Sequence, residues 1–553
     1  MLSWVSRAAR VTLVAILATL CAPSLVLAQV DVGPAGASQV ELEQILERGQ
    51  SLEQERRWGE ALTHYEEALR QHPNERRLEQ RFTTTKLHYD LARRYSDQSF
   101  VRSLAGLSET DALALYSEVL LKIHSHYVEQ PGWRHLVDRG TQGIEIALTD
   151  PVFVERYLRN VNPTAVKRFR DDLYRTLRAL PINDRHQARS AVAQAGALGR
   201  QRLGVPPTCI ILEYVCGATN ALDDFSAFLT GDQLNETYSQ IDGNFVGLGI
   251  ELKSTDGALL IVKVIPGSPA EKSGLAGGDT IVAVAGRSTA DMSTDEAANL
   301  LQGEEGTTVE LQLRSPQGQD YRASVRRAHV EIPSITDEAL LDRDRGIAYL
   351  KLTCFQKTTA RDLDAALWRL HRQGMKQLII DLRGNPGGLL TSSVEVADKF
   401  VDQGTIVATR GRNPHEDFTY SAHRAGTWKL PLVVLIDGDS ASASEIFAGA
   451  IRDHRRGTIV GMRSYGKGSV QGIFPLNLAR SGLRLTTAKF YSPNGHPYSK
   501  VGVEPDVQVH RVAKPAEDTN FQPPARDQDL VLSEALRVAR SQLASDSKAS
   551  RPR

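Results

Sequence analysis

The stretch that decides the fold is Asp437–Gln471, which reads DGDSASASEIFAGAIRDHRRGTIVGMRSYGKGSVQ. The apolar run LVVLID leads into it and predicts a buried strand that ends in a turn of small residues. The segment EIFAGAIRDH has the spacing of an amphipathic helix, and TIVGM predicts a further strand. A serine at such a turn lies at the positive end of a helix, where free backbone N–H groups can hold an oxyanion. The pattern therefore indicates an α/β domain, and a serine at this turn is one way to build a nucleophile.

The composition is that of a large globular protein with several domains. The chain has 553 residues, and 41% of them are hydrophobic, so it can bury several cores. Lys+Arg and Asp+Glu number 66 each, which gives a formal net charge of zero. A general binder of nucleic acid or of anionic membranes needs a basic surplus, so this balance argues against both classes of partner.

The first residues have the pattern of an export signal. Arg7 and Arg10 form a basic start, and the apolar run Val11–Leu20 that follows is short for a membrane span. We therefore predict a signal peptide over residues 1–28 and a periplasmic or extracellular location. The alternatives are an uncleaved membrane anchor and a lipoprotein attached at Cys21.

Three cysteines, Cys209, Cys216 and Cys354, follow the export signal. An exported compartment permits disulfides, and Cys209 and Cys216 form a local pair that could close a small loop. Buried free thiols are an equal alternative. The chain has no CxxC motif and no His/Cys cluster, so we expect neither a metal site nor a cofactor.

A helical region precedes the first β-rich segment. Within residues 40–105, the sequence ERRWGEALTHYEEALRQHP resembles a tetratricopeptide (TPR) repeat, with small Ala61 and Ala68 at close helix contacts. A solenoid needs about three such repeats, and one copy is visible. We therefore expect a helical hairpin that packs on the next domain, with a surface for an adaptor protein as the alternative. Residues 106–230 continue with a helical pattern.

Residues 240–328 resemble a PDZ domain. The loop Gly247, Leu248, Gly249 and Ile250 matches its carboxylate-binding loop, and SPAEKSGLAGGDTIVAVAG matches its internal motif. Consecutive backbone N–H groups in a glycine-containing loop form a nest for an anion, and an adjacent strand edge can pair with an extended peptide. This segment therefore predicts a site for the C-terminal residues of proteins, and a plain spacer is the alternative.

Strand and helix patterns alternate over residues 330–510, which predicts a mainly parallel sheet with function at the carboxyl ends of its strands. One buried strand, in QLIIDLRGNPGGLL, runs into a glycine-rich turn that can donate an N–H to an oxyanion. Residues 511–553 read as a Pro/charge-rich linker, a helix over Asp527–Leu543 and a tail.

The three serines of SASAS and the lysine of GKGS each have a structural alternative. Ser440, Ser442 and Ser444 are residue types that commonly cap a helix. Lys467 can act as a base near neutral pH only if burial lowers its pKa, and otherwise it is a surface lysine or an anion ligand. A P-loop is excluded because Gly468, rather than Ser or Thr, follows the lysine.

Taken together and in order, these motifs resemble the carboxyl-terminal processing (tail-specific) serine proteases, which use a Ser-Lys dyad. The resemblance covers about residues 221–509. Its pieces are LDDFSAFLTGDQ, the PDZ motif, IAYLKLTCFQ, IIDLRGNPGGLL, DSASASEIFAGAI, SYGKGSVQ and GVEPDVQV. The family implies a multidomain α+β fold, in which a helical TPR-like N-terminal region and a PDZ-like domain precede an α/β protease core of the crotonase/ClpP-like type.

The resemblance also implies a role for individual residues. Ser442 matches the nucleophile, Lys467 the general base and Gln471 the third member, which orients the lysine. The backbone N–H of Ala443 matches one oxyanion donor. The other donor is a glycine of the Gly387-Gly388 pair, and we favour Gly388.

Three functions remain in competition. The first is an exported serine endopeptidase that recognises protein C-termini through its PDZ domain. The second is a peptide-binding PDZ/TPR scaffold or pseudoprotease without catalysis, which need not keep Ser442, Lys467 and Gln471 together. The third is a non-proteolytic hydrolase on a related fold, against which the PDZ-like segment argues.

Overall fold

The computed structural model describes residues 39–255, 258–290, 300–301, 303–423, 427–509 and 529–549. The export signal expected at residues 1–28 lies outside these ranges. The chain divides into two compact units, Met1–Tyr89 and Asp90–Arg553. Within the ranges above, no helix has both the length and the apolar character needed to span a bilayer.

The first unit contains helices α1 (Gln39–Gln54), α2 (Trp58–Gln71) and the first part of α3 (Arg76–Ser96). The two helices predicted before Pro73 are therefore present. Their core consists of Leu46, Leu52, Ala61, Tyr65, Ala68 and Leu78. Gly49 lets α1 and α2 approach closely, because a Cβ at this position would lie 2.3 Å from the Tyr65 ring. Membership of the TPR class stays a prediction.

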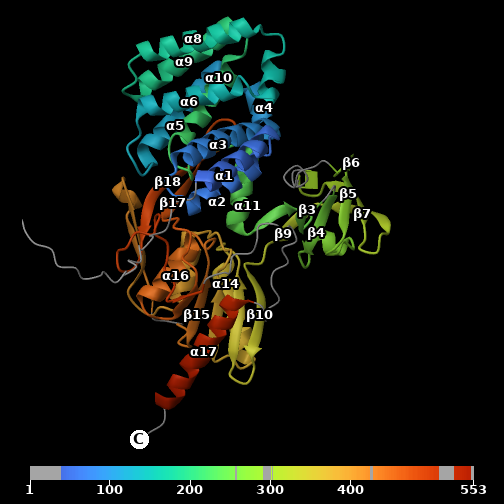
Figure 1. The fold of residues 1–553 in the computed structure, drawn as a ribbon, viewed down its shortest axis with the longest axis vertical. Helices are drawn as coiled ribbons and strands as arrows, with labels where there is room; N and C mark the ends of the chain where they lie inside the picture. The colour runs from blue at the N-terminus through green and yellow to red at the C-terminus, as the bar shows by residue number, and fades with distance from the viewer. Residues whose placement is uncertain are drawn as a thin grey trace, which may run out of the picture. The chain divides into compact units, whose positions relative to one another are not determined.

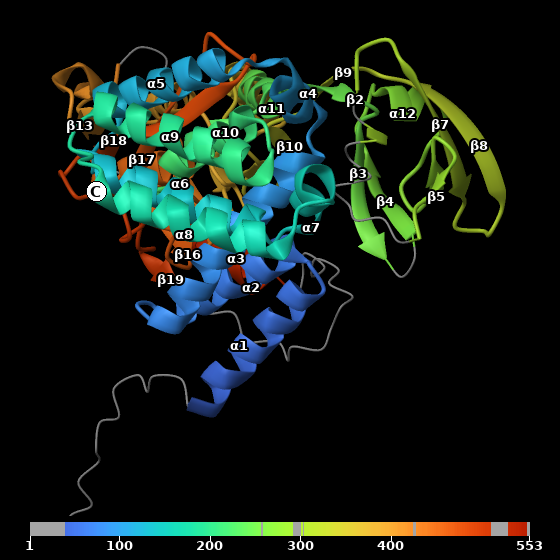
Figure 2. The ribbon, with the colours of Figure 1, turned by 90° about the horizontal axis from the view of Figure 1, so that it is seen from above.

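The second unit begins with a helical body. Its helices are α4 (Gln98–Gly106), α5 (Glu109–His126), α6 (Trp133–Ala147), α7 (Pro151–Phe153), α8 (Pro163–Ala179), α9 (Arg185–Leu203) and α10 (Pro207–Asn220), with a π-helical turn at Val154–Leu158. Helix α10 is buried along almost its whole length and contacts α5, α6 and α9 (Figure 2). A helix can be enclosed in this way because its sequence, PTCIILEYVCGATN, is apolar on nearly every face.

Helix α10 also decides the state of two cysteines. Cys209 and Cys216 are free and buried on this one helix. A helix rises about 1.5 Å per residue, so their Cα atoms are separated by roughly 10 Å, beyond the reach of a disulfide. Of the two alternatives for this pair, the buried free thiols are therefore correct.

The PDZ segment forms a separate antiparallel sheet in the order β3-β4-β5-β7-β8, with β6 beside β5 (Figure 1). The strands are β3 (Ile250–Thr255), β4 (Ala258–Val264), β5 (Thr280–Val284), β6 (Arg287–Ser288), β7 (Thr308–Arg314) and β8 (Asp320–Arg326), and a short helix α12 spans Pro269–Lys272. Strands β2 (Asn244–Gly247) and β9 (Ala328–Glu331) pair where the chain enters and leaves this domain. Strand β3 is an edge of the sheet, as an added peptide strand requires.

The protease core contains a six-stranded sheet in the order β10-β11-β12-β15-β16-β19. Its strands are β10 (Ile335–Asp342), β11 (Ile347–Leu352), β12 (Gln377–Asp381), β15 (Leu432–Ile436), β16 (Thr458–Gly461) and β19 (Val507–Gln508). All neighbouring pairs are parallel except β10 with β11. The prediction of a mainly parallel sheet is confirmed.

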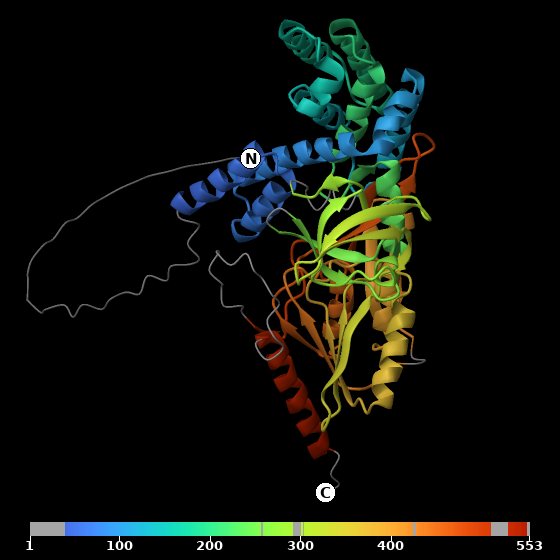
Figure 3. The ribbon, with the colours of Figure 1, turned by 90° about the vertical axis from the view of Figure 1, so that its right-hand side faces the viewer.

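Both faces of this sheet are covered, which explains why its central strands are mainly apolar rather than alternating apolar and polar residues. Alternate residues of the strands point to opposite faces. Leu350, Ile380 and Val434 pack in one cluster with residues of α14 (Thr359–Arg372), α15 (Leu390–Asp398) and α16 (Ala443–Asp453). Tyr349, Ile379 and Val433 pack with residues of the C-terminal helix α17 (Leu530–Ala549), drawn in red in Figure 3.

A second sheet was not anticipated from the sequence. Strands β1 (Ala227–Leu229), β13 (Thr405–Gly411), β14 (Phe418–Ser421), β17 (Ser469–Pro475) and β18 (Gly482–Tyr491) pair antiparallel around β18. A 3₁₀ turn at Pro414–Glu416 and helix α11 (Gly231–Asp242) accompany it. Local patterns in TIVATRG and LRLTTAKFYSPNG predict the strands β13 and β18 of this sheet, but not β1, β14 and β17. The pairings also escape prediction, because strands so distant in sequence leave no local signal. In this sheet β1 and β17 pair with opposite edges of β18, and the loop before β1 places Phe225 near Lys467.

The C-terminal helix also differs from its prediction. Its predicted range was Asp527–Leu543 with a tail from Ala544, whereas α17 begins at Leu530 and continues to Ala549. Asp529 stands immediately before the helix, and its carboxylate accepts a hydrogen bond from the Leu532 N–H (3.0 Å), which fixes the start.

Candidate active site

The predicted nucleophile lies at the turn between β15 and α16. Ser442 is the residue before the helix, and its backbone has φ 56° and ψ −112°, a left-handed conformation that costs a non-glycine residue about 1–3 kcal/mol. The carboxylate of Glu445 accepts a hydrogen bond from the Ser442 N–H (2.7 Å) and so helps to hold this conformation. Strain at a helix N-terminus is typical of a residue that presents its side chain to a substrate.

The structure distinguishes the three serines of this turn. Ser440 is fully buried and its hydroxyl donates to the Leu382 carbonyl (2.9 Å). Ser444 is also fully buried, and its hydroxyl donates to the Asn385 carbonyl (3.0 Å). Both tie the turn to the neighbouring loop, whereas Ser442 is partly exposed. The structural role expected of a small-residue turn thus belongs to Ser440 and Ser444, and Ser442 remains accessible.

The glycine-rich loop after β12 packs directly against Ser442. A Cβ added to Gly387, whose φ is +105°, would lie 2.8 Å from the Ser442 Cβ, so only glycine allows this approach. Asn385 is fully buried; its Nδ2 donates to the Leu352 carbonyl (2.8 Å), and its Oδ1 accepts from the Gly387 N–H (2.9 Å). The Ala441 N–H donates to the Asn385 carbonyl (3.0 Å) and joins the loop to the serine turn.

These contacts separate the two candidate glycines. The Gly387 N–H is engaged by Asn385, so it cannot serve an oxyanion while that bond lasts. Within the described part of the chain, neither the Gly388 N–H nor the Ala443 N–H donates to a protein acceptor. Ala443 is the first residue of α16, where backbone N–H groups have no partner inside the helix. The geometry therefore supports Gly388 and Ala443 as the donor pair.

Glu445 joins the serine turn to the lysine segment, and the sequence analysis did not identify it. Besides the Ser442 N–H, its carboxylate accepts hydrogen bonds from the Lys467 N–H (2.9 Å), the Gly466 N–H (2.7 Å) and the Ser464 hydroxyl (2.6 Å). Burial raises the pKa of Glu445, and these hydrogen bonds act against that rise. One side chain thus fixes both predicted dyad residues through their backbones. The S-x-x-E spacing of a capping box was the available signal.

Lys467 has the environment that a lysine base requires. Burial lowers its pKa below the ordinary value, and the positive charge of Arg484 lowers it further. Its Nζ lies 4.8 Å from the centroid of the Phe225 ring. Arg484 Nε donates to the Phe225 carbonyl (2.8 Å), which holds that residue in place. The aromatic ring beside the lysine therefore comes from the segment LDDFSAFL, far upstream in the sequence.

The structure does not bring Gln471 to Lys467. The Gln471 Nε2 donates to the Ser469 hydroxyl (3.0 Å), and its Oε1 accepts from the Thr486 hydroxyl (3.2 Å). Among the described residues, no hydrogen bond joins Lys467 Nζ to Gln471 or to Ser442 Oγ. Catalytic hydrogen bonds are often long or absent without substrate and form in the complex, so the missing bond is compatible with the predicted Ser442–Lys467 dyad.

The predicted peptide-binding loop is held mainly by backbone contacts. The Leu248 carbonyl accepts from the Ala270 N–H (2.9 Å), and the Gly249 carbonyl accepts from the Ile265 N–H (2.9 Å). The N–H groups of Leu248 and Gly249 donate to no acceptor in the described ranges, which leaves them available to a carboxylate. Gly249 has φ +81°, and Ile250 begins the edge strand β3.

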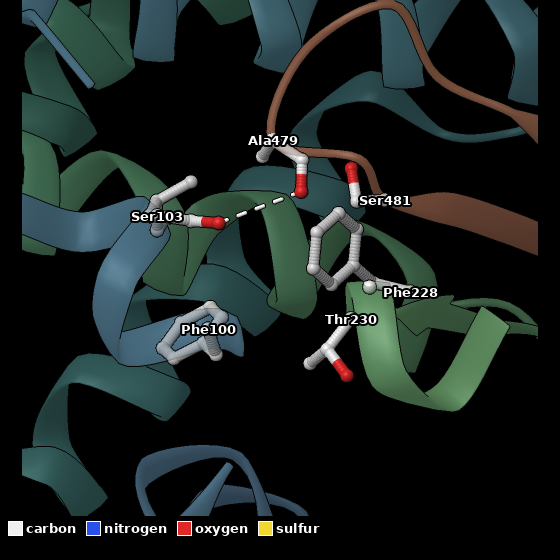
Figure 4. Close-up of a pocket in the computed structure, with 8 residues that line it drawn as sticks. Phe100, Ser103, Phe228, Thr230, Ala479 and Ser481 are labelled. Carbon is white, nitrogen blue, oxygen red and sulfur yellow. Dashed lines mark hydrogen bonds between the residues drawn. The ribbon is translucent and has the colours of Figure 1, made fainter. Parts of the chain in front are cut away.

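A pocket elsewhere in the second unit does not compete with this site. It lies between α4, α10, β1 and the turn that joins β17 to β18, with Phe100, Phe228 and Thr230 among its lining residues (Figure 4). Its volume of about 10 Å³ is at the lower limit for one water molecule. The Ser103 hydroxyl there donates to the Ala479 carbonyl at 3.4 Å, a structural contact. In the described ranges no cluster of His, Cys, Asp and Glu side chains suited to a metal ion is found.

Comparison with known proteins agrees with this geometry. Peptidase family S41 matches residues 346–509, and the PDZ domain matches residues 260–315. The chain is 35% identical over 308 residues to the carboxy-terminal-processing protease of Bartonella bacilliformis. These residues make up 55% of this chain and 70% of that protein. The chain belongs to the carboxy-terminal-processing protease family. The predicted family, the serine-type peptidase class and the combination of helical region, PDZ domain and α/β core are thereby confirmed.

Other members of the carboxy-terminal-processing protease family also match this chain. The carboxy-terminal processing protease CtpA of Bacillus subtilis is 33% identical over 295 residues, which is 53% of this chain and 62% of the relative. Among solved structures, a photosystem II D1 C-terminal processing protease is 27% identical and covers 72% of this chain and 92% of its own, with a TM-score of 0.38.

Proposed function

We propose that this protease cleaves proteins whose C-terminal residues its PDZ domain binds, with Ser442 as nucleophile and Lys467 as general base. Neutral Lys467 accepts the Ser442 hydroxyl proton while Oγ forms a bond to the peptide carbonyl carbon. The N–H groups of Gly388 and Ala443 hold the resulting oxyanion. Collapse of the intermediate breaks the C–N bond, and the amine leaves with the proton from Lys467. Water then hydrolyses the acyl-enzyme with the same groups.

The observation that carries this proposal is the bridge that Glu445 makes between the two dyad segments. Its carboxylate binds the backbone N–H groups of Ser442 and Lys467 at once, at 2.7 and 2.9 Å. Burial of a carboxylate costs free energy unless hydrogen bonds compensate it. The hydrogen bonds that compensate Glu445 come from both dyad segments, so this side chain holds the two segments together. The lowered pKa of Lys467 supports the same assignment, because a base must reach its neutral form at working pH.

Substrate binding completes the site in this proposal. Lys467 Nζ turns from the Phe225 ring toward Ser442 Oγ, and Gln471 exchanges its Ser469 contact for the lysine, which it then orients. Both changes are rotations of side chains, because Glu445 already fixes the backbone of Lys467. The backbone preorganisation supplies the larger part of the site before any substrate arrives.

Recognition, location and partners complete the proposal. The free N–H groups of Leu248 and Gly249 bind the terminal carboxylate, and the peptide adds to the edge of β3. The basic and apolar start of the chain supports export to the periplasm or beyond, with an uncleaved signal as a possible membrane attachment. The TPR-like helices are the surface we assign to an adaptor protein, on the strength of their sequence pattern.

The test is degradation of an unstructured protein with an apolar C-terminus by the purified mature chain and by Ser442→Ala. We expect the first to cleave it and the second to be inactive while still binding it. The matched substrate control is the same protein with an amidated C-terminus, which lacks the carboxylate and should be cleaved more slowly. Equal cleavage by both enzymes, or none by either, would contradict the Ser-Lys assignment and favour a peptide-binding scaffold.

A further inference from the structure

The C-terminal helix α17 lies outside the S41 match, which ends at residue 509, yet it is built into the protease core. Its apolar side chains pack on the face of the sheet opposite α16. The buried residues of α17 are Val531, Leu532, Ala535, Val538 and Ala539. Burial of this extent attaches the helix firmly, but it does not by itself connect α17 with the chemistry on the other face.

The connection is made by Asp529, the residue before α17. Its carboxylate caps the helix through the Leu532 N–H (3.0 Å). The same carboxylate pairs with the Arg383 guanidinium at both ends, with its Oδ1 2.9 Å from one terminal nitrogen and its Oδ2 2.8 Å from the other. Both side chains are largely buried, 17% and 16% exposed, so water screens this pair little. The hydrogen bond to Oδ1 and the ion-pair contact with Oδ2 together restrict the orientation of the guanidinium.

Arg383 is held from its other side by the last residue of β12. Asp381 accepts from the Arg383 Nε at 3.0 Å and from a terminal nitrogen at 2.6 Å, and it also accepts from the Arg383 N–H (2.9 Å). The Tyr349 hydroxyl also donates a hydrogen bond to Oδ2 of this buried carboxylate (2.9 Å). Arg383 is therefore clamped between two carboxylates, one on the sheet and one on α17.

The clamp stands at the entrance to the oxyanion loop, which we define as residues 383–388. The loop leaves β12 at Arg383 and ends at Gly388, whose N–H is free. Further along, the Gly384 N–H donates to Asp437 (3.0 Å) and Asn385 holds Gly387, so three residues of this loop besides Arg383 have a hydrogen-bond partner. A shift at Arg383 is passed along a short, closely packed loop to Gly388.

We propose that Asp529 is a positioning residue for catalysis, because it fixes Arg383 and thereby the oxyanion loop, and so makes α17 a part of the catalytic apparatus. The inference rests on the proposed role of Gly388. It assigns a function to a residue that lies 146 positions from Arg383 and outside the S41 match.

The test is the variant Asp529→Ser. Serine also caps a helix, so α17 keeps its start, but its short side chain cannot reach Arg383. We expect kcat on a short chromogenic peptide to fall about 10- to 100-fold, because a displacement of a catalytic group by about 1 Å lowers the rate by up to about this factor. KM should change less than about twofold. A peptide boronate, which resembles the tetrahedral intermediate, should lose affinity by a similar factor.

The matched control is Gln542→Ala on the same helix. Gln542 Nε2 donates to the Thr458 hydroxyl (2.9 Å) and its Oε1 accepts from Gln377 (2.7 Å), so it attaches α17 to the sheet without contacting the loop. We expect this variant to keep the wild-type kcat, although it loses about as much thermal stability as Asp529→Ser. An equal fall of kcat in both variants would show a role in stability alone and would overturn the proposal, as would an unchanged kcat in Asp529→Ser.

A second measurement separates this inference from the proposed function. Amide hydrogen exchange at residues 383–388 should become faster in Asp529→Ser and stay unchanged in Gln542→Ala, whether or not the chain cleaves peptides. If the wild type is inactive but the exchange changes as expected, the proposed function fails and the clamp on the loop stands. If the wild type cleaves and the exchange is unaffected, the clamp fails and the proposed function stands.

Discussion

Two loops of this protein offer free backbone N–H groups to a carbonyl or carboxylate oxygen, and they are held in different ways. The oxyanion pair, Gly388 and Ala443, is fixed by buried polar side chains, above all Asn385 and Glu445. The PDZ loop presents the N–H groups of Leu248 and Gly249 and is held by two backbone bonds and by the packing of one leucine.

The difference corresponds to what each loop has to do. A developing oxyanion gains most from donors that do not reorganise, and a network of buried side chains gives them a single arrangement. A peptide terminus binds in its ground state and arrives with different sequences, so backbone contacts on an open sheet edge are sufficient. We therefore expect substitutions around the oxyanion pair to change kcat, and substitutions around the PDZ loop to change affinity.

The largest effect is expected at the catalytic end of this comparison, for Lys467→Ala. Removal of the base should lower kcat by about 10⁴-fold or more, because the loss of one residue of a catalytic dyad removes nearly all of the rate that the dyad provides. Lys467→Arg should be equally inactive, because a guanidinium keeps its proton and cannot act as a base. Both are measured on a short peptide that does not need the PDZ domain. Activity in the arginine variant would contradict a lysine base.

An intermediate effect is expected at the PDZ loop, for Gly249→Ala. The added Cβ would lie 2.3 Å from the Ser268 Cβ, and φ is +81°. The loop must therefore shift, and we expect affinity for a C-terminal peptide to fall about tenfold, or about 1.4 kcal/mol. Binding is measured by fluorescence anisotropy with the Ser442→Ala form, so that the peptide stays intact.

The control for this change is Gly274→Ala. Gly274 has the same φ of +81°, but an added Cβ would meet nothing within 4 Å, so the backbone strain is matched and the clash is absent. This variant should bind the peptide as the wild type does. If Gly249→Ala instead lowered kcat on a short peptide while binding was kept, the separation of the two loops would be wrong.

The smallest effect is expected for Arg484→Gln, which sharpens the assignment of the base. The Arg484 charge lowers the pKa of Lys467, so its removal should raise that pKa. A base is active only when neutral, and the acidic limb of the kcat/KM profile should therefore move to higher pH. The control is Lys489→Gln, which removes a positive charge from the same strand, β18, and should leave the pH of the acidic limb unchanged. An unmoved limb in Arg484→Gln would mean that another group titrates.

Much of the fold and of the site could be predicted from the sequence. The helical region, the PDZ segment, the mainly parallel sheet and the turn at Ser442 each follow from local patterns of apolar, small and glycine residues. The antiparallel sheet around β18 was missed, because its strands are separated by long stretches of chain. The choice of Ser442 rested on a family resemblance, and the burial of Ser440 and Ser444 now supports it on physical grounds.

The sequence alone determined the elements and the order of the motifs, since strand and helix periods, turn residues and motif spacing are local properties. Only the tertiary structure decided which side chains meet. Nothing in the sequence shows that Glu445 binds the Lys467 backbone, that Phe225 lies beside the Lys467 side chain, or that Asp529 pairs with Arg383. Glu445 lies 22 positions from Lys467, Phe225 lies 242 positions from Lys467, and Asp529 lies 146 positions from Arg383. The buried surroundings that strengthen each contact exist only after the chain has folded.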